Sequence, residues 1–153
     1  MRVACRHWGG GRAAHMRELT LAIIKPDAIS QGHAGEILWM LERAGFRIRG
    51  MRMLHLTRSQ AEAFYAVHHG KGFFAELVRF VTEGPVIVMA LEREDAIARL
   101  REVMGATDPA QAAEGTIRQR YGTSIQRNAI HGSDAPGTAA FELGYFFSAV
   151  DLT

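Results

Sequence analysis

The sequence predicts one α+β domain in which helices cover the faces of an antiparallel four-stranded sheet. Three observations favour this fold class. Strand-like apolar runs alternate with helix-like segments from Leu19 onwards, and no linker separates them. The order of these segments is β-α-β-α-α-β-α-loop-β-α. No glycine-rich loop follows any strand-like run, as one does in many doubly wound parallel sheets.

The first third of the chain is expected to form a strand, a helix and a second strand. The apolar run Leu19 to Ile24 should end near Lys25, because the proline that follows cannot donate to a sheet. Apolar side chains recur at helical spacing from His33 to Ala44. The segment Phe46 to Leu56 alternates and then changes side around Gly50, which predicts a strand with a bulge.

The middle of the chain is expected to form helices on either side of a central strand. Ser59 to Glu62 is typical of a capping box that opens a helix. Phe73 to Val81 has the pattern of a short amphipathic helix. Val86 to Leu91 is continuously apolar, as central strands are, and Asp95 to Met104 is helical again.

The last third begins with Gly105 to Gln126, which shows no convincing periodicity. Such long stretches are usually functional or disordered. A short strand, Arg127 to Ile130, and a helix, Thr138 to Phe147, should complete the chain. Without the additional helices the order is βαββαβ, that of a ferredoxin-like fold with a long loop before its last strand. A doubly wound parallel sheet is the alternative.

The basic residues are unevenly distributed along the chain. Residues 1–17 hold four of the 18 basic residues and no acidic one, which leaves 14 basic against 16 acidic residues elsewhere. The charge therefore does not favour a folded face for specific nucleic-acid binding. We expect residues 1–17 to be a disordered leader and residues 18–153 to be the domain. An organelle transit peptide, or a true start at Met16, is the alternative.

The sequence indicates neither a membrane protein nor a disulfide scaffold. No apolar run approaches the roughly 20 residues that a membrane-spanning helix needs. Cys5 is the single cysteine, so no internal disulfide can form, which is compatible with a reducing compartment. We expect a cytoplasmic protein.

A histidine at the end of a predicted strand is the first candidate for chemistry. His131 follows an apolar run and is followed at once by Gly132, Ser133 and Asp134. Imidazole is substantially deprotonated at neutral pH, so it can attack phosphorus without a strong base. Glycine allows close approach of another molecule, and the two polar residues can orient neighbouring groups. A strand-end histidine before a tight turn is the structural alternative.

Cationic residues form a second set of candidates. Lys25, at the end of the first strand, could meet a phosphate with its ammonium group. Arg101 and Arg118, with Thr107, surround the long loop, and guanidinium groups pair bidentately with phosphate oxygens. The alternatives are a lysine extended along a strand end and exposed arginines in salt bridges.

An aromatic segment with two adjacent histidines is the third candidate. His68 and His69 point about 100° apart on a helix, and no second pair lies at the spacing that a zinc site needs. Phe73 and Phe74 are typical of a core, although an aromatic exposed at a cleft could stack on a base.

Six segments together resemble the nucleoside diphosphate kinase family. They occur in the family's order and spacing and extend over about Glu18 to Phe147; the segment Asn-x-x-His-Gly-Ser-Asp is highly specific. The segments are Lys25-Pro26-Asp27, Tyr65-Ala66-Val67-His68, Gly84-Pro85-Val86, Gly105-Ala106-Thr107-Asp108-Pro109-Ala110, Gly115-Thr116-Ile117-Arg118 and Arg127-Asn128-Ala129-Ile130-His131-Gly132-Ser133-Asp134.

The resemblance implies roles for individual residues. His131 corresponds to the nucleophile that accepts the γ-phosphate on Nδ1, and Glu142 to the acid that hydrogen-bonds the other ring nitrogen. Lys25 and Tyr65 correspond to the pair that approaches the transferring phosphate. The remaining matches contact the nucleotide: Arg101, Thr107 and Arg118 at the α- and β-phosphates, Asn128 and Lys25 at the ribose, Phe73 stacked on the base and Leu77 as a nearby apolar contact.

The implied activity is ping-pong transfer of phosphate from a nucleoside triphosphate to a nucleoside diphosphate. Mg²⁺ is expected to travel on the nucleotide phosphates without a protein metal site. A homo-oligomer is implied, a tetramer or hexamer built from dimers. Glu114 stands where the family usually has proline, in a loop that packs between subunits, so the assembly stays open. A catalytically weak regulatory paralogue and a nucleic-acid-binding protein that uses the basic leader are the alternative functions.

Overall fold

The computed structural model describes residues 17–152. Residues 1–16 of the expected leader lie outside the described part of the chain. Arg17, the last residue of that leader, is described, and its guanidinium lies 2.9 Å from the Glu92 carboxylate.

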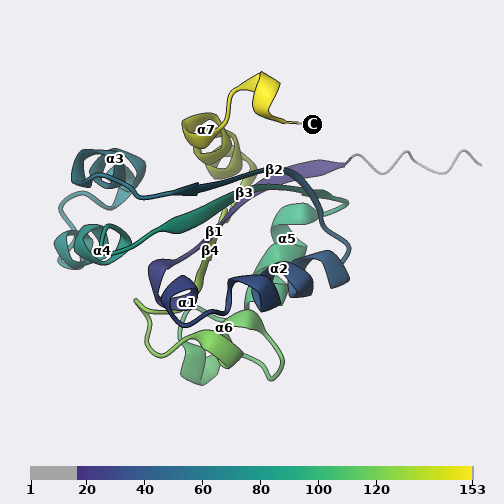
Figure 1. Ribbon diagram of the computed structural model, residues 1–153, viewed down its shortest axis with the longest axis horizontal. Coiled ribbons are helices and arrows are strands. Elements are labelled where there is room, and N and C mark those ends of the chain that lie inside the picture. The colour runs from purple at the N-terminus through teal and green to yellow at the C-terminus, as the bar shows by residue number, and fades with distance from the viewer. Residues whose placement is uncertain (1–16, 153) are drawn as a thin grey trace, which may run out of the picture.

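The described residues form a four-stranded sheet with strand order β2-β3-β1-β4 (Figure 1). All three pairs of neighbouring strands are antiparallel. This is the order of the ferredoxin-like fold, so the predicted fold class is confirmed and the parallel alternative is wrong. The strands are β1 (Glu18–Ile24), β2 (Arg47–Leu54), β3 (Val86–Arg93) and β4 (Ile130–Gly132).

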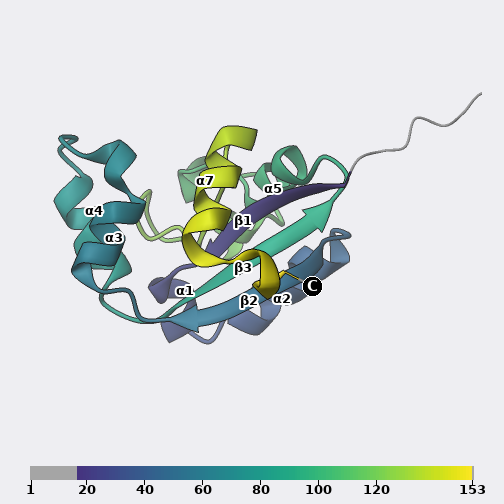
Figure 2. The ribbon, with the colours of Figure 1, turned by 90° about the horizontal axis from the view of Figure 1, so that it is seen from above.

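Helices cover both faces of the sheet. In Figures 1 and 2, α7 lies on one face, α2 and α5 lie on the other, and α3 and α4 extend beyond one end. The helices are α1 (Pro26–Ser30), α2 (Ala34–Arg43), α3 (Arg58–Phe64), α4 (Phe74–Val81), α5 (Ala96–Met104), α6 (Ile117–Tyr121) and α7 (Pro136–Phe146). Single 3₁₀ turns span Ala66–His68, Pro109–Gln111 and Ala149–Asp151.

The sheet separates two apolar clusters. Successive strand residues point to opposite faces, so Ala22 and Ile24 of β1 pack with α2 and α5, while Leu21 and Ile23 pack with α3, α4 and α7. Burial on both faces explains why residues 21–24 of β1 and 86–91 of β3 are continuously apolar. His131 in β4 pairs with Ile23 and therefore faces the α7 side.

Several predicted boundaries are corrected. The bulge in β2 is confirmed between Ile48 and Gly50. The capping box that opens α3 is formed by Thr57 and Gln60 and not by Ser59 and Glu62. The Thr57 hydroxyl accepts from the Gln60 amide (3.2 Å), and the Gln60 side chain accepts from the Thr57 amide (2.9 Å), which moves the helix start upstream.

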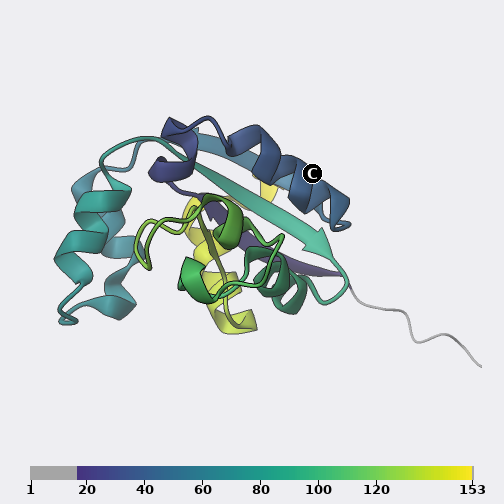
Figure 3. The same ribbon diagram turned by 90° about the horizontal axis from the view of Figure 1, so that it is seen from below.

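The end of the chain differs most from the prediction. The stretch Gly105 to Gln126 contains α6 and a 3₁₀ turn, which are too short to produce a periodic pattern (Figure 3). The last strand begins at Ile130 and not at Arg127, because Ala129 has a left-handed backbone with φ 69° that no strand residue adopts. His131 therefore lies within β4 rather than after it.

Candidate active site

The site is centred on His131, which β4 presents towards α7. Its Nε2 lies 3.0 Å from Oε1 of Glu142, a buried residue on α7. The hydroxyl of Ser133 donates to the other oxygen of Glu142 at 2.6 Å. That hydroxyl also accepts from the Leu21 amide at 3.3 Å, so the group is tied to β1.

This geometry selects one tautomer of His131. An ionised Glu142 can only accept hydrogen bonds, so Nε2 must carry the ring proton. The lone pair is then on Nδ1, and the side chain of His131 is 23% exposed. The arrangement leaves a nucleophilic nitrogen at the surface of a site whose other ring nitrogen is fixed.

Two aromatic rings hold the imidazole edge-on. The ring centroids of Tyr65 and His131 are 6.1 Å apart, and those of Phe64 and His131 are 5.8 Å apart. The Tyr65 hydroxyl is buried and has no hydrogen-bond partner among residues 17–152. Burial, and next the charge of Glu142, raises the pKa of Tyr65, so the hydroxyl stays neutral.

Lys25 lies directly after β1, and its ammonium group is turned towards the segment that precedes β4. Its Nζ donates to Oδ1 of Asn128 at 2.7 Å and lies 3.4 Å from the carbonyl oxygen of Gln126. Burial, and next the charge of Arg118, lowers the pKa of Lys25 to about 8, while Asp27 acts in the opposite direction. An incoming phosphate would favour the charged form.

Arg118 on α6 connects the loop to β4. Its Nη1 donates to the Gly105 carbonyl at 3.1 Å and its Nη2 to the Ile130 carbonyl at 3.0 Å. Its Nε is buried without a partner in the described chain. Burial, and next the charge of Arg101, lowers the pKa of Arg118 to about 10. The charge of Arg101 is close enough to disfavour that of Arg118, so these two guanidinium groups form a site that suits an anion.

The other predicted nucleotide contacts are placed around this centre. Asn128 is buried and donates from Nδ2 to the Thr107 carbonyl at 2.9 Å, so the amide joins Lys25 to the loop. Arg101 and Thr107 are exposed. Asp134 is also exposed, and a hydrogen bond from the Thr138 side chain lowers the pKa of Asp134.

The aromatic candidates lie on the hairpin formed by α3 and α4. Phe73 is 47% exposed and contacts His68 edge-on, with ring centroids 5.4 Å apart. Leu77, one turn further along α4, is partly buried against the cluster on the α7 side. Phe74 also packs against that cluster, so of the two adjacent phenylalanines it is Phe73 that is free to stack.

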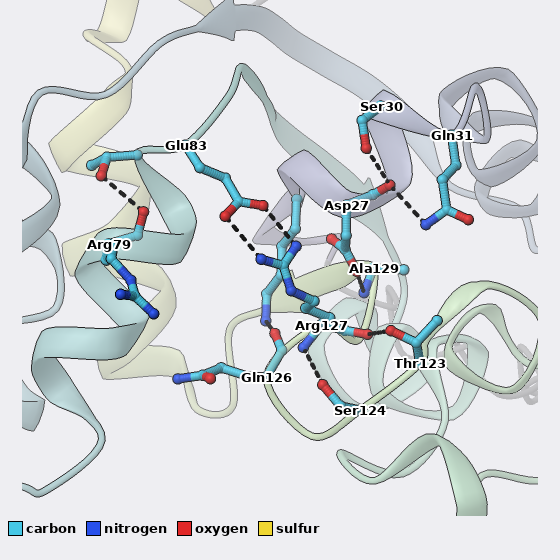
Figure 4. Close-up of polar contacts among 12 residues, drawn as sticks. Asp27, Ser30, Gln31, Arg79, Glu83, Thr123, Ser124, Gln126, Arg127 and Ala129 are labelled. Carbon is cyan, nitrogen blue, oxygen red and sulfur yellow. Dashed lines mark hydrogen bonds and ion pairs between the residues drawn. The ribbon is translucent and has the colours of Figure 1, made fainter.

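Two polar contacts that the sequence did not predict lie at the turn before β4 (Figure 4). The Asp27 carboxylate accepts from the Ala129 amide at 3.0 Å. Arg127 forms two hydrogen bonds with the Glu83 carboxylate, at 2.7 and 2.9 Å. Asp27 belongs to the segment Lys25-Pro26-Asp27, and its position beside a proline after an apolar strand was the one signal that it is buried. Nothing in the sequence pairs Arg127 with Glu83.

Neither a metal cluster nor a membrane span is found in the described part of the chain. Among residues 17–152 no three His, Cys, Asp or Glu side chains gather as a metal site would require. No helix there is long and apolar enough to cross a membrane. A cavity of about 420 Å³ opens between α2, α5 and the loop, with Trp39, Arg43 and Arg120 in its lining, and contains none of the candidate site residues.

Comparison with known proteins identifies the family. Residues 18–152 match the family described as nucleoside diphosphate kinase. The chain is 57% identical over 135 residues to the nucleoside diphosphate kinase of Sorangium cellulosum, covering 88% of this chain and 94% of that protein. It is 58% identical over 135 residues to that of Syntrophotalea carbinolica, covering 88% and 98%.

Solved structures agree with the sequence comparisons. The Aquifex aeolicus nucleoside diphosphate kinase superposes with a TM-score of 0.89 at 42% identity, covering 90% of this chain and all of that one. The Halobacterium salinarum enzyme, solved in complex with CDP, superposes with a TM-score of 0.87 at 39% identity, covering 90% and 92%. The chain therefore belongs to the nucleoside diphosphate kinase family of phosphotransferases.

Proposed function

We propose that this kinase carries the transferred phosphate on Nδ1 of His131, in a ping-pong reaction between nucleoside triphosphates and diphosphates. The observation that carries the proposal is the 3.0 Å contact between His131 Nε2 and the buried Glu142. It leaves the lone pair of the imidazole on Nδ1. The Lys25 ammonium and the Arg118 guanidinium contact Asn128 and Ile130, which precede His131 in the chain.

In the first half-reaction Nδ1 attacks the γ-phosphorus. The N–P bond forms as the bond to the bridging oxygen breaks, and the nucleoside diphosphate leaves with that electron pair. The imidazole gains positive charge as the bond forms, and Glu142 stabilises it through the proton on Nε2. A second nucleoside diphosphate then takes the phosphate by the reverse path.

The remaining side chains bind and orient the nucleotide. Arg101, Arg118 and Thr107 would hold the α- and β-phosphates, and Lys25 with Tyr65 would approach the transferring phosphate. Asn128 would contact the ribose. Stacking of the base on Phe73, beside Leu77, requires no hydrogen bond to a base edge, so the site would accept different bases. The CDP complex of the similar Halobacterium salinarum enzyme supports a nucleotide in this family's site.

Mg²⁺ is proposed to enter with the nucleotide. The groups proposed to meet the phosphates are mainly cationic, the Lys25 ammonium and the Arg118 guanidinium, which cannot ligate a metal ion. Phosphate oxygens are better ligands, and the cation would neutralise their charge. The protein side chains then need only orient the metal-bearing phosphate chain.

The proposal also covers how the protein assembles and where in the cell it acts. β2 is an edge strand, and it exposes Met51 and Met53, while Trp39 on α2 is 57% exposed. Exposed apolar groups beside a sheet edge favour association, so we propose a homo-oligomer built from dimers, a tetramer or hexamer.

A cytoplasmic location is proposed because the substrates are found there and the single cysteine requires no oxidising compartment.

The decisive experiment mixes the purified protein with Mg²⁺ and γ-labelled ATP and then adds unlabelled GDP. Acid-labile, alkali-stable label should form on the protein and then leave as GTP. Folded protein that binds ATP without becoming labelled would contradict the proposal and favour a regulatory nucleotide-binding module. Salt-dependent DNA retention that disappears on deletion of residues 1–17 would favour the nucleic-acid alternative.

A further inference from the structure

The turn that leads into β4 has an unusual backbone. Ala129 has φ 69°, and among residues 17–152 only Asp95 is another non-glycine residue with positive φ. The Ile130 amide donates to the Asn128 carbonyl, two residues earlier, at 2.8 Å. Positive φ with this hydrogen bond defines a classic γ-turn, which is rare and strained for a residue with a Cβ. Such a conformation persists only if its surroundings hold it.

Both polar backbone groups of Ala129 are held by one short segment. The Lys25 amide donates to the Ala129 carbonyl at 2.9 Å. The Ala129 amide donates to Oδ2 of Asp27 at 3.0 Å (Figure 4). Pro26 fixes the backbone between these two partners. Asp27 is 4% exposed, and its other carboxylate oxygen has no partner in the described chain. The Ala129 amide is therefore the one hydrogen-bond donor to this carboxylate among residues 17–152.

Residues on both sides of the turn belong to the proposed site. The side chain of Asn128 accepts from Lys25 Nζ at 2.7 Å and donates to the Thr107 carbonyl at 2.9 Å. The Ile130 carbonyl accepts from Arg118 at 3.0 Å, and His131 is the next residue. A change in the Ala129 conformation would therefore alter the direction of Asn128 relative to the strand that carries His131.

We propose that Asp27 is a positioning residue, which holds Ala129 in the γ-turn and so aligns Asn128 and Lys25 with His131. The inference rests on the proposed function, since it concerns the same site. Asp27 acts on the reaction through the backbone and does not touch the substrate.

A nearby ion pair provides the matched control. Glu83 accepts two hydrogen bonds from Arg127, the residue before Asn128, but both side chains are substantially exposed. A surface pair of this kind contributes little to conformation. Glu83→Gln therefore removes a carboxylate from the same turn region without removing a buried backbone contact.

The test measures single-turnover labelling of His131 by γ-labelled ATP, expressed per folded molecule. Asp27→Ala should lower the labelling rate by about thirtyfold, since small misplacements of reacting groups are costly. Asp27→Asn keeps an acceptor for the Ala129 amide and should stay within about threefold of the unchanged protein. Glu83→Gln should stay within about twofold.

A double variant tests whether the effect runs through the turn. Glycine adopts positive φ without steric cost, so Asp27→Ala should lower the rate only about fivefold in an Ala129→Gly background. If Asp27→Ala does not fold, this comparison between the double variant and Ala129→Gly takes its place. A loss of about thirtyfold or more there would overturn the inference, because glycine should have relieved the turn, as would an Asp27→Ala rate within about twofold of the unchanged protein.

The outcomes separate this inference from the proposed function. If the unchanged protein forms no phosphohistidine, the proposed function fails. If it is labelled and Asp27→Ala is labelled equally fast, only the positioning role of Asp27 fails. A loss in Asp27→Ala that Ala129→Gly does not reduce would also contradict the role, because the carboxylate would then act elsewhere.

Discussion

The two sides of the site differ in how firmly the fold holds them. Lys25, Arg118 and Asn128, at the sheet edge, are buried and joined by hydrogen bonds to the backbone or to one another. On the α3–α4 hairpin, Phe73 is about half exposed and Val67 is 79% exposed. Lys25, Arg118 and Asn128, which are proposed to meet the phosphates and the ribose, are preorganised, whereas the surface that would meet the base is open to solvent.

This difference matches the demands of the two tasks. Phosphoryl transfer depends on charges that are already in position, because reorganising them during the reaction is costly. Stacking on a base needs only an accessible aromatic face. We therefore expect substitutions at the sheet edge to lower activity or nucleotide affinity more than substitutions on the hairpin do.

The largest effect is expected for His131→Ala. Transfer should be abolished, while the protein keeps its melting temperature within a few degrees because the side chain is partly exposed. Nucleotide exchange and labelling assays on the folded variant provide the measurement. Residual turnover above a few per cent would mean that another nucleophile carries the phosphate.

Arg118→Ala is expected to weaken nucleotide binding by about a hundredfold and to leave slow labelling of His131. The guanidinium supplies charge to the phosphates and also supports the Ile130 carbonyl, so about 2–3 kcal/mol should be lost. Titration calorimetry with a nucleoside diphosphate measures the affinity. An unchanged dissociation constant would remove Arg118 from phosphate binding, and Arg99→Ala, on the exposed side of α5, is the matched control.

The activity should decline as the pH rises through the pKa of Lys25. Burial and the charge of Arg118 lower this pKa to about 8, and the ammonium group is the form that attracts phosphate. At pH 9 only about a tenth of the free protein would carry the charge, so kcat/KM should fall about tenfold relative to pH 7. Lys25→Arg keeps its charge and should lose this alkaline limb; a limb that persists unchanged would assign it to another group.

Phe73→Ala should have the smallest effect, a rise in KM of about fivefold with kcat nearly unchanged. The ring is half exposed, so we take the low end of the stacking contribution, about 1 kcal/mol. KM values for purine and pyrimidine diphosphates should rise together. A loss confined to one base would mean that the hairpin recognises base edges, and a loss larger than that of Arg118→Ala would reverse the comparison.

The sequence by itself determined the strand and helix order, because each apolar run and each helical period reflects burial on one or two faces. It also singled out His131, Lys25 and Arg118 as candidate site residues, through motifs whose order and spacing resemble those of the family. The sequence did not predict the shortest helices, because α1 and α6 each span five residues, less than two turns, and produce no periodic pattern.

Only the tertiary structure decided which distant residues meet. Glu142 reaches His131, a contact that only the family resemblance implied, because α7 packs back across the sheet. Asp27 reaches Ala129 because β1 and β4 are neighbours. The left-handed turn at Ala129, which shortens the last strand, depends on that long-range hydrogen bond and not on the local preference of alanine. Local patterns encode burial and periodicity, whereas strained backbone and paired buried charges exist only where the fold supplies their partners.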